Sequence, residues 1–369
     1  INNLKTKMLF NVIEMNKEKL EELLTATLNN DIKQSTAKVY IDNITKMYDL
    51  VKHEERPFEE NLREIVYATE IIIPFLTQKG VFTDNTIKNY LNSIIVVSKM
   101  SIFKDQSDEA KKNYDTSMEI YFKLYSNYKD KIAQKSLNNT KKEEQKENWI
   151  TPKEFNDVLK KMRKDIEKKR KSGIPITNPE FKIPLQDFIV MMLYSGKWVR
   201  PLRNDYADMK ILFQDQHYSD VIQANQYQNY IFLHASGYGS DEAEGKLAVS
   251  ICLNDDKTIK VYKEREYHIN RGSILINYIR LLGEIRQEEG SDDFLLNPRD
   301  NTPMSKNNLT KYLQNITKKW LDKSVSSSTL RHMFISNLDH NKLTNKTLDK
   351  IAKDMRHSKK TQQNNYKLV

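Results

Sequence analysis

Cysteine and long apolar runs are nearly absent from this chain of 369 residues. The single cysteine, Cys252, excludes an internal disulfide framework and a zinc site built on several cysteines, and we expect it to be a small buried apolar side chain. No apolar run reaches the length of a membrane span, and the first residues lack the pattern of a signal peptide. These absences predict an intracellular protein that is not secreted and has no membrane partner.

Basic residues outnumber acidic ones, 60 to 50, which gives a formal net charge of +10 at pH 7. Such a balance suits a polyanionic partner, and nucleic acid is the first candidate. An excess of lysine is also typical of the codon usage of AT-rich genomes, so charge alone does not decide between the two interpretations. The chain, with 38% hydrophobic residues, is long enough for two or three domains, each with its own core.

Apolar residues recur at helical spacing through the first 130 residues. The pattern predicts helices over 36–51, from 61 to the region of Pro74, from Thr83 or Asp84 to Val97, and over 113–128. Residues 135–148 then contain one apolar residue and dense charge, as expected of a solvated connector. We predict a helical domain at 1–134 and a charged linker at 135–149.

A second domain is predicted at 150–369. It opens on a capping box, Thr151 to Glu154, with Pro152 at the first helical position. Three β-branched and aromatic runs, at 229–234, 247–253 and 259–269, predict three antiparallel strands. Helices are expected over 274–284, 305–320, 329–338 and 344–355. The predicted fold is therefore mainly α-helical with a small antiparallel β-sheet.

Two polar motifs and a tyrosine stand out in residues 328–369. Arg331 lies in the predicted helix STLRHMFISN, and the turn Arg356-His357-Ser358 comes before Tyr366, which follows His357 by nine positions. These segments resemble the C-terminal motifs of tyrosine recombinases of the phage-integrase type, in which an arginine is followed by a Gly-His-Ser-like turn and a nucleophilic tyrosine. The resemblance implies that Arg331, His357 and Tyr366 are catalytic.

These residue types suit the breaking of a phosphodiester bond without metal or nucleotide. A phenol oxygen can attack phosphorus to form a phosphotyrosyl link, which the 5′ hydroxyl of a second strand can later reverse. Guanidinium groups donate two hydrogen bonds to non-bridging oxygens and stay charged. The chain has 19 tyrosines, most of which must be packing or surface residues, and the polar segment around Tyr366 distinguishes it. No cofactor and no metal ion are expected.

A first arginine is expected upstream, near the start of a helix. The segment 193–211, which contains Arg200 and Arg203, resembles the first-arginine region of the same family. It is closest to a Pro-x-Arg-x-Asp-Tyr form associated with recombinases of large DNA viruses and eukaryotic mobile elements. The resemblance implies that Arg203 is catalytic, with Arg200 as the alternative because the register is ambiguous by a few residues. Two surface arginines on a capped helix are the other interpretation.

The general acid of this family is a lysine on a β-hairpin turn. Lys257 lies at the predicted turn between two strands and is our choice for this role. Lys246 and Lys260 are the alternatives. In so lysine-rich a chain, each of the three could equally be a solvated side chain.

Ser328 is a departure from the family pattern, which places a histidine three residues before the second arginine. A hydroxyl can bind a phosphate oxygen, but it cannot accept a proton near neutral pH as imidazole does. Base catalysis is then weak, or His357 or His332 supplies it. We expect His332 to be structural, because adjacent helical positions do not share a face.

The N-terminal domain resembles, more loosely, the core-binding domain that closes the recombinase clamp over DNA. Its lysines are expected to contact phosphates or simply to keep the helices soluble, for instance Lys33, Lys38, Lys46 and Lys88. The implied partner is double-stranded DNA, bound by a homotetramer on paired sites in the nucleus, the nucleoid or a viral replication site. The alternatives are a type IB topoisomerase-like enzyme and a non-catalytic DNA-binding protein that retains the fold.

Overall fold

The chain divides into two compact units, Ile1–Asn138 and Asn139–Val369, in a computed structural model. The structure describes residues 18–28, 34–103, 107–137, 143–214, 228–234, 248–255, 258, 261, 265–269, 273–339, 341–358 and 361–362. These residues are mainly helical, with a small four-stranded sheet in the second unit. The predicted fold class is therefore confirmed in its main feature.

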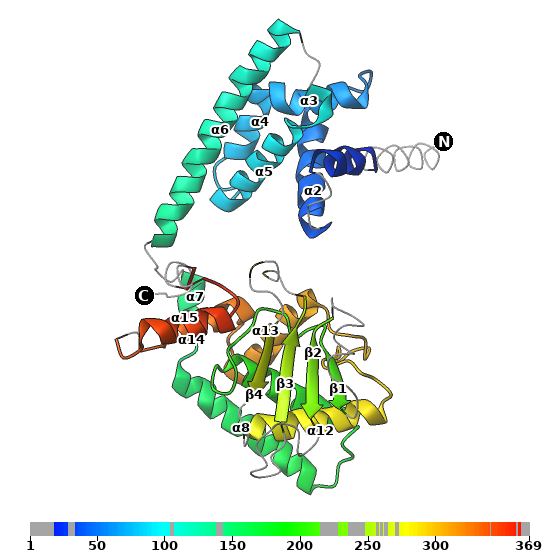
Figure 1. Cartoon of the computed structure of the whole chain (residues 1–369), viewed down its shortest axis with the longest axis vertical. Coiled ribbons are helices and arrows are strands. Elements are labelled where there is room, and N and C mark those ends of the chain that lie inside the picture. Colours follow the sequence, from blue (N-terminus) through cyan, green and yellow to red (C-terminus); the bar gives the residue numbers. More distant parts are fainter. Residues whose placement is uncertain are drawn as a thin grey trace. The chain divides into compact units, whose positions relative to one another are not determined.

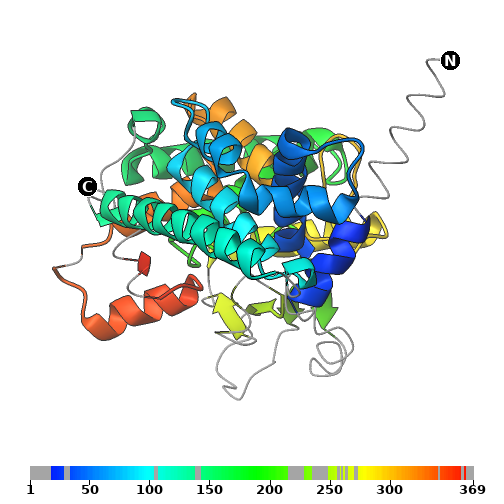
Figure 2. The ribbon, with the colours of Figure 1, turned by 90° about the horizontal axis from the view of Figure 1, so that it is seen from above.

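The described part of the first unit is helical throughout its regular structure (Figures 1 and 2). Its labelled elements are α2 (Gln34–Val51), α3 (Phe58–Tyr67), α4 (Thr69–Thr77), α5 (Asp84–Val97), the 3₁₀ turn η1 (Ser101–Phe103) and the long α6 (Asp108–Leu137). Apolar faces of these helices form one core, in which Ile44, Leu62 and Leu91 are fully buried. The helical spacing in the sequence arises from this shared core.

Two boundaries in this region differ from the prediction. One helix was expected up to the region of Pro74, but the segment forms two helices that break at Ala68, and α4 continues through Pro74 to Thr77. Proline removes the hydrogen bond to the carbonyl four residues earlier, which belongs to Glu70. Because Glu70 is exposed, water can satisfy that carbonyl. The predicted linker also contains regular structure, because α6 reaches Leu137 and α7 spans Glu143–Glu147.

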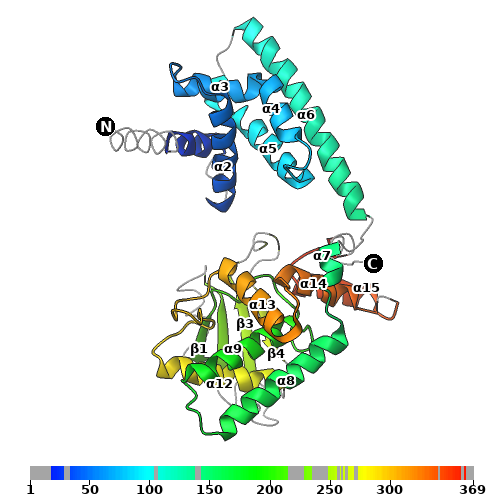
Figure 3. The ribbon, with the colours of Figure 1, turned by 180° about the vertical axis from the view of Figure 1, so that it is seen from behind.

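Besides the short α7, the described part of the second unit contains six labelled helices and the sheet (Figures 1 and 3). The helices are α8 (Pro152–Lys171), α9 (Pro179–Tyr194), α12 (Ile274–Glu288), α13 (Lys306–Leu321), α14 (Ser327–Ser336) and α15 (Asn345–Asp354). Figure 3 shows α8, α9 and α13 on one side of this unit, with the strands behind them. The helix α9 lies outside the predicted helices. Its residues from Leu185 to Tyr194 are all buried, so it has no polar face to reveal a helical period.

The sheet has the order β1-β2-β3-β4, formed by Lys210–Gln214, Tyr230–His234, Ala248–Leu253 and Arg265–Ile269. The pairs β2–β3 and β3–β4 are antiparallel, but β1 runs parallel to β2, with Ile211 opposite Ile231. The three predicted antiparallel strands correspond to β2, β3 and β4, and the prediction missed the fourth strand, β1. A parallel pair needs a long connection rather than a tight turn, so no hairpin signal in the sequence indicates this pairing.

The predicted capping box at the start of α8 is present. The Thr151 hydroxyl accepts a hydrogen bond from the Glu154 amide at 3.2 Å, and a Glu154 carboxylate oxygen accepts one from the Thr151 amide at 2.7 Å. Lys323, four residues before α14 begins, donates to the other Glu154 oxygen at 2.8 Å and to the Trp149 carbonyl at 2.6 Å. The cap of α8 thus also fixes the segment that leads into α14.

Replacing Glu154 with glutamine should lower the free energy of unfolding at pH 7 by about 1 kcal/mol, because the carboxylate that caps α8 and pairs with Lys323 is lost. These hydrogen bonds lower the pKa of Glu154 to about 2. The stabilisation is therefore present above the ordinary carboxyl pKa and disappears as the pH falls toward the folded value. Urea unfolding of both proteins at several pH values measures this.

The matched control is Asp157→Asn on the same helix, where the carboxylate makes an exposed contact with Lys160 at 3.3 Å. Its effect should be a few tenths of a kcal/mol at most. Equal effects of the two substitutions would show that the capping box does not stabilise the unit.

Candidate active site

Arg203 lies on the segment between α9 and β1, which is fixed at both sides of this arginine. The Tyr194 hydroxyl at the end of α9 donates to the Arg203 carbonyl. The Asn204 amide nitrogen donates to the Lys306 carbonyl and to the Thr310 hydroxyl, both at 2.7 Å, which attaches the segment to α13. The backbone at Arg203 is therefore held in place by two helices that the sequence separates widely.

The same segment turns at Gly196, which has a left-handed φ of 71°. A Cβ atom at this position would lie 2.1 Å from a ring carbon of Phe334 on α14. Glycine is therefore required twice, for its backbone conformation and for the close approach of the two elements. This contact brings the first-arginine segment against the helix that carries Arg331.

Arg331 is almost fully buried in α14, with 1% of its surface exposed. One terminal nitrogen donates to the Pro201 carbonyl at 2.6 Å, and the other donates to the Met355 carbonyl at 2.9 Å. The guanidinium group thus joins the first-arginine segment to the end of α15. Packing of Ile335 against Ile351 and Met355 holds α14 and α15 together.

His357 follows a turn that closes α15. The His357 amide donates to the Ala352 carbonyl and the Arg356 amide to the Lys353 carbonyl, both at 3.0 Å, which is the pattern of a Schellman motif. The carbonyl of Arg356 accepts a hydrogen bond from an Arg203 terminal nitrogen at 3.3 Å. Arg203, Arg331 and His357 therefore lie around one turn.

The His357 ring is buried, with 3% of the residue exposed. Burial, and then the positive charges of Arg331 and Arg203, lower its pKa to about 4, against a raising effect of the Ser358 carbonyl. The ring is neutral near pH 7. Its Nδ1 lies 3.3 Å from the Ser358 carbonyl oxygen, which can only accept, so Nδ1 carries the hydrogen and Nε2 is the accepting nitrogen.

Arg200, the alternative first arginine, has different surroundings. It donates to the Gly196 carbonyl at 3.5 Å, and its guanidinium carbon lies 5.5 Å from the centre of the Phe334 ring. Unlike Arg203, it is not among the charges that lower the pKa of His357. The structure thus brings Arg203, rather than Arg200, next to the histidine turn.

The remaining predicted residues have varied positions. Ser328 is exposed in the first turn of α14, on the side of the helix that Arg331 shares, and His332 is half-buried. Lys38 and Lys46 are exposed on α2, while Lys88 is half-buried on α5. Four predicted or alternative residues lie outside the described part of the chain, namely Lys33, Lys246, Lys257 and Lys260, as does the expected nucleophile Tyr366.

Two contacts that the sequence did not indicate connect the sheet to the histidine turn. The Thr258 hydroxyl, next to Lys257 in the sequence, donates to the Arg356 carbonyl at 3.5 Å. The Tyr267 hydroxyl on β4 donates to the Asp354 carbonyl at 2.9 Å. No local sequence pattern predicts either contact, because both join segments about ninety residues apart. Together they place Thr258 and Tyr267 beside the turn that carries His357.

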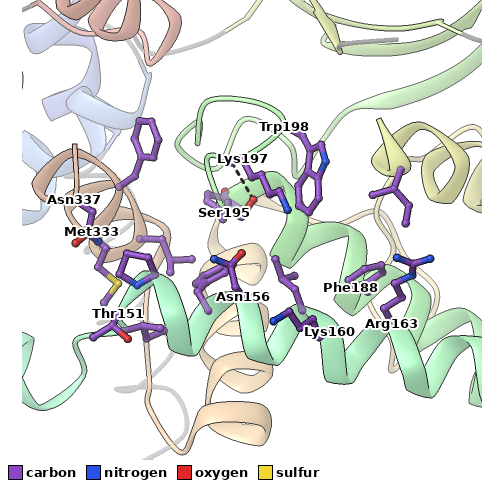
Figure 4. A pocket seen from close by; sticks show the side chains of 18 of the residues that line it. Thr151, Asn156, Lys160, Arg163, Phe188, Ser195, Lys197, Trp198, Met333 and Asn337 are labelled. Carbon is purple, nitrogen blue, oxygen red and sulfur yellow. Dashed lines mark hydrogen bonds between the residues drawn. The ribbon is translucent and has the colours of Figure 1, made fainter. Parts of the chain in front are cut away.

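A cavity of about 630 Å³ lies on another face of α14 (Figure 4). Its lining comes mainly from α8, from α9 and the segment after it, and from α14, and includes Lys160, Trp198 and Met333. Leu330 also lines it, and Arg331 is one residue further on, about 100° around the helix. The cavity and the arginine site therefore use different faces of the same helix.

A comparison with solved structures finds similarity to a crystal structure of XerA recombinase. The two chains share 11% sequence identity, the alignment covers 95% of this chain and 94% of the other, and the TM-score is 0.35. No protein-family model matches the sequence, and neither does any curated protein. Within the described residues, no helix is long and apolar enough to cross a membrane, and no group of three or more His, Cys, Asp or Glu side chains could hold a metal ion.

The buried His357 should make folding sensitive to pH. Its pKa changes from an ordinary 6.5 to about 4 on folding, so between these values the unfolded chain binds a proton that the folded chain does not. Stability therefore falls as the pH falls through this window, by on the order of 3 kcal/mol from this group. In His357→Gln this loss should be absent, and urea unfolding at pH 7 and at about pH 4.5 measures it.

The exposed His53 provides the control, because His53→Gln should lose stability with falling pH as the wild type does. If His357→Gln also follows the wild-type pH dependence, the imidazole is not the buried neutral group described here.

Proposed function

We propose that the chain is a tyrosine recombinase that cleaves and rejoins DNA through a covalent 3′-phosphotyrosyl intermediate on Tyr366. The observation that carries the proposal is the meeting of Arg203, Arg331 and His357 from three separate segments. Two guanidinium groups and a neutral imidazole form a site of net positive charge. A phosphodiester group is the ligand that such a set of donors fits best.

The proposed reaction assigns one task to each group. The Tyr366 hydroxyl loses its proton to a base and attacks phosphorus, and the bond from phosphorus to the 5′ oxygen breaks. Arg203 and Arg331 donate hydrogen bonds to the non-bridging oxygens as negative charge develops on them. The leaving 5′ oxygen takes a proton, for which Lys257 is the proposed source.

His357 is suited to accept a hydrogen bond or a proton through Nε2, because the ring is neutral near pH 7. A bound phosphate would favour the protonated ring and raise its pKa from the low value that the arginines impose. The ring could then take up a proton during the step and return it afterwards. This role does not require the histidine that Ser328 replaces.

Double-stranded DNA is the proposed substrate, and a tetramer on paired sites is the proposed assembly. In the first unit, Lys38 and Lys46 are exposed on the same helix, where they can reach phosphates. Such contacts add affinity that depends on salt, without reading the base sequence. The phosphotyrosyl link conserves the energy of the broken bond, so the rejoining step needs no nucleotide.

A nicked duplex that releases a short strand on cleavage tests the proposal, because it traps the covalent adduct. The wild-type chain should form an adduct that resists denaturing electrophoresis, and Tyr366→Phe should form none. Arg203→Ala should lower the rate of adduct formation by roughly 100-fold or more, as expected for a lost charge-stabilising donor. Arg200→Ala should change this rate by less than about threefold, because lost contacts away from the reacting atoms have small effects.

The control for the nucleophile is Tyr128→Phe on α6, which should leave adduct formation unchanged. Persistence of the adduct in Tyr366→Phe would overturn the assignment of the nucleophile. DNA binding without an adduct would instead indicate a non-catalytic DNA-binding protein. An adduct accompanied by relaxation of supercoiled DNA, but not by strand exchange between two labelled duplexes, would indicate an enzyme like the type IB topoisomerases.

A further inference from the structure

Arg356 has a backbone conformation that is unusual for its residue type. Among the described residues, three that are not glycine have a left-handed φ, namely Asn301, Asp322 and Arg356, each between 55° and 58°. Asparagine and aspartate enter this region readily because their short polar side chains can hydrogen-bond locally. Arginine has no such advantage. Its presence at this position therefore needs another explanation.

The position itself would favour glycine. Arg356 occupies the residue after the end of α15 in the Schellman motif described above, with the hydrogen bonds His357 to Ala352 and Arg356 to Lys353. Glycine is the usual residue there because it lacks the Cβ atom that crowds a left-handed backbone. A side chain that contributed nothing would be unfavourable compared with glycine.

The Arg356 side chain is also buried, with 1% of the residue exposed, and ranks with Arg331 among the largest fully buried side chains. A guanidinium group keeps its charge in proteins, and a buried charge is tolerated only when the surrounding protein supplies partners. The side chain is therefore held inside the unit rather than extending into solvent. An arginine that merely terminated a helix would extend its charged end into water.

The backbone around Arg356 supports the three groups of the candidate site. Its carbonyl accepts hydrogen bonds from Arg203 and Thr258, at 3.3 and 3.5 Å. The preceding carbonyl, of Met355, accepts one from Arg331 at 2.9 Å. His357 is the next residue. A small rotation of this turn would therefore move both arginine contacts and the imidazole together.

We propose that Arg356 is a positioning residue, whose buried guanidinium fixes the turn that orients Arg203, Arg331 and His357. The proposal rests on the proposed function for its effect on catalysis, but its structural content concerns the turn alone. The proposed role acts through this turn rather than through contact with a substrate. In this proposal, burial of the side chain offsets the unfavourable left-handed conformation.

Arg356→Gly is the informative substitution, because it keeps the backbone conformation and removes only the side chain. Arg356→Met retains most of the side-chain volume without the charge, and Arg356→Lys retains the charge without the planar fork. Asp322→Gly is the matched control. It relieves the same left-handed conformation at the end of α13, at an exposed side chain.

With the nicked duplex at saturating concentration, Arg356→Gly and Arg356→Met should form adduct at least about tenfold more slowly than wild type, as expected from misplaced reacting groups. Their affinity for DNA should change little. Arg356→Lys should lie between these variants and wild type, and Asp322→Gly should match wild type.

A second readout does not depend on DNA. NMR titration of the free protein should show the pKa of His357 higher in Arg356→Gly than in wild type. The groups that face this ring are Arg331 from α14, Arg203 from the segment after α9 and the Ser358 carbonyl from its own turn. Removing the neighbouring buried side chain admits water and lets Arg203 move, and both changes favour the protonated ring. A loss of global stability alone would not move this pKa.

A folded Arg356→Gly or Arg356→Met that cleaves at the wild-type rate, with the pKa of His357 unchanged, would overturn the proposal. If neither variant folds, Arg356→Lys decides, because a wild-type rate with an unchanged pKa would show that the planar fork is not needed. Failure of the proposed function has a different signature, since the wild type would then form no adduct. The titration would still report whether Arg356 orients His357.

Discussion

The candidate site depends above all on the two hydrogen bonds that Arg331 donates to the carbonyls of Pro201 and Met355. Each carbonyl belongs to a different segment, and neither segment pairs with the other through regular secondary structure. Because the guanidinium is buried, these two carbonyls replace the water that would otherwise accept its hydrogen bonds. The hydrogen bonds of Arg331 thus determine where the Arg203 segment and the histidine turn lie.

Carbonyl acceptors have an electrostatic consequence. A carbonyl oxygen satisfies a guanidinium donor through a partial charge, so it leaves the positive charge of the group in place. The effect reaches His357, whose pKa is lowered to about 4 by burial and by the charges of Arg331 and Arg203. A site that favours an anion therefore disfavours a protonated histidine. Binding of a phosphate would relax this conflict, which couples the protonation of His357 to occupancy of the site.

Local sequence patterns predicted the elements that local interactions create. The helices around the site begin at hydroxyl caps, Thr151 for α8, Ser305 for α13, Ser326 for α14 and Thr344 for α15, and such caps act within one turn. The helix α9 is buried on all sides and β1 pairs in parallel with a distant strand. Neither property produces a periodic pattern or a turn signal in the sequence, so α9 and β1 could be located only from the tertiary structure.

The site shows the same division between local and long-range information. The motif around Arg331 and His357 is readable in the sequence, but Arg200 and Arg203 are only three positions apart on the same segment between α9 and β1. The two arginines differ in their long-range contacts. Arg203 donates to the carbonyl of Arg356, 153 residues further along the chain, whereas the Arg200 guanidinium lies over the Phe334 ring. The spacing of residues in the sequence could not distinguish the two arginines, because their contacts depend on how α14 and α15 pack.

Arg356 marks the point where local preference and tertiary structure disagree most clearly. A left-handed residue at a helix end favours glycine, and a charged side chain favours the surface, yet both preferences are violated at one residue. Sequences that fold well satisfy local preferences nearly everywhere, and exceptions concentrate where function imposes a different demand. The exception, Arg356, directly precedes the buried His357 and follows Met355, whose carbonyl accepts a hydrogen bond from the buried Arg331. The Arg356 carbonyl accepts a hydrogen bond from Arg203. The strain at this turn therefore follows from assembling three cationic or polar groups around one point of the backbone.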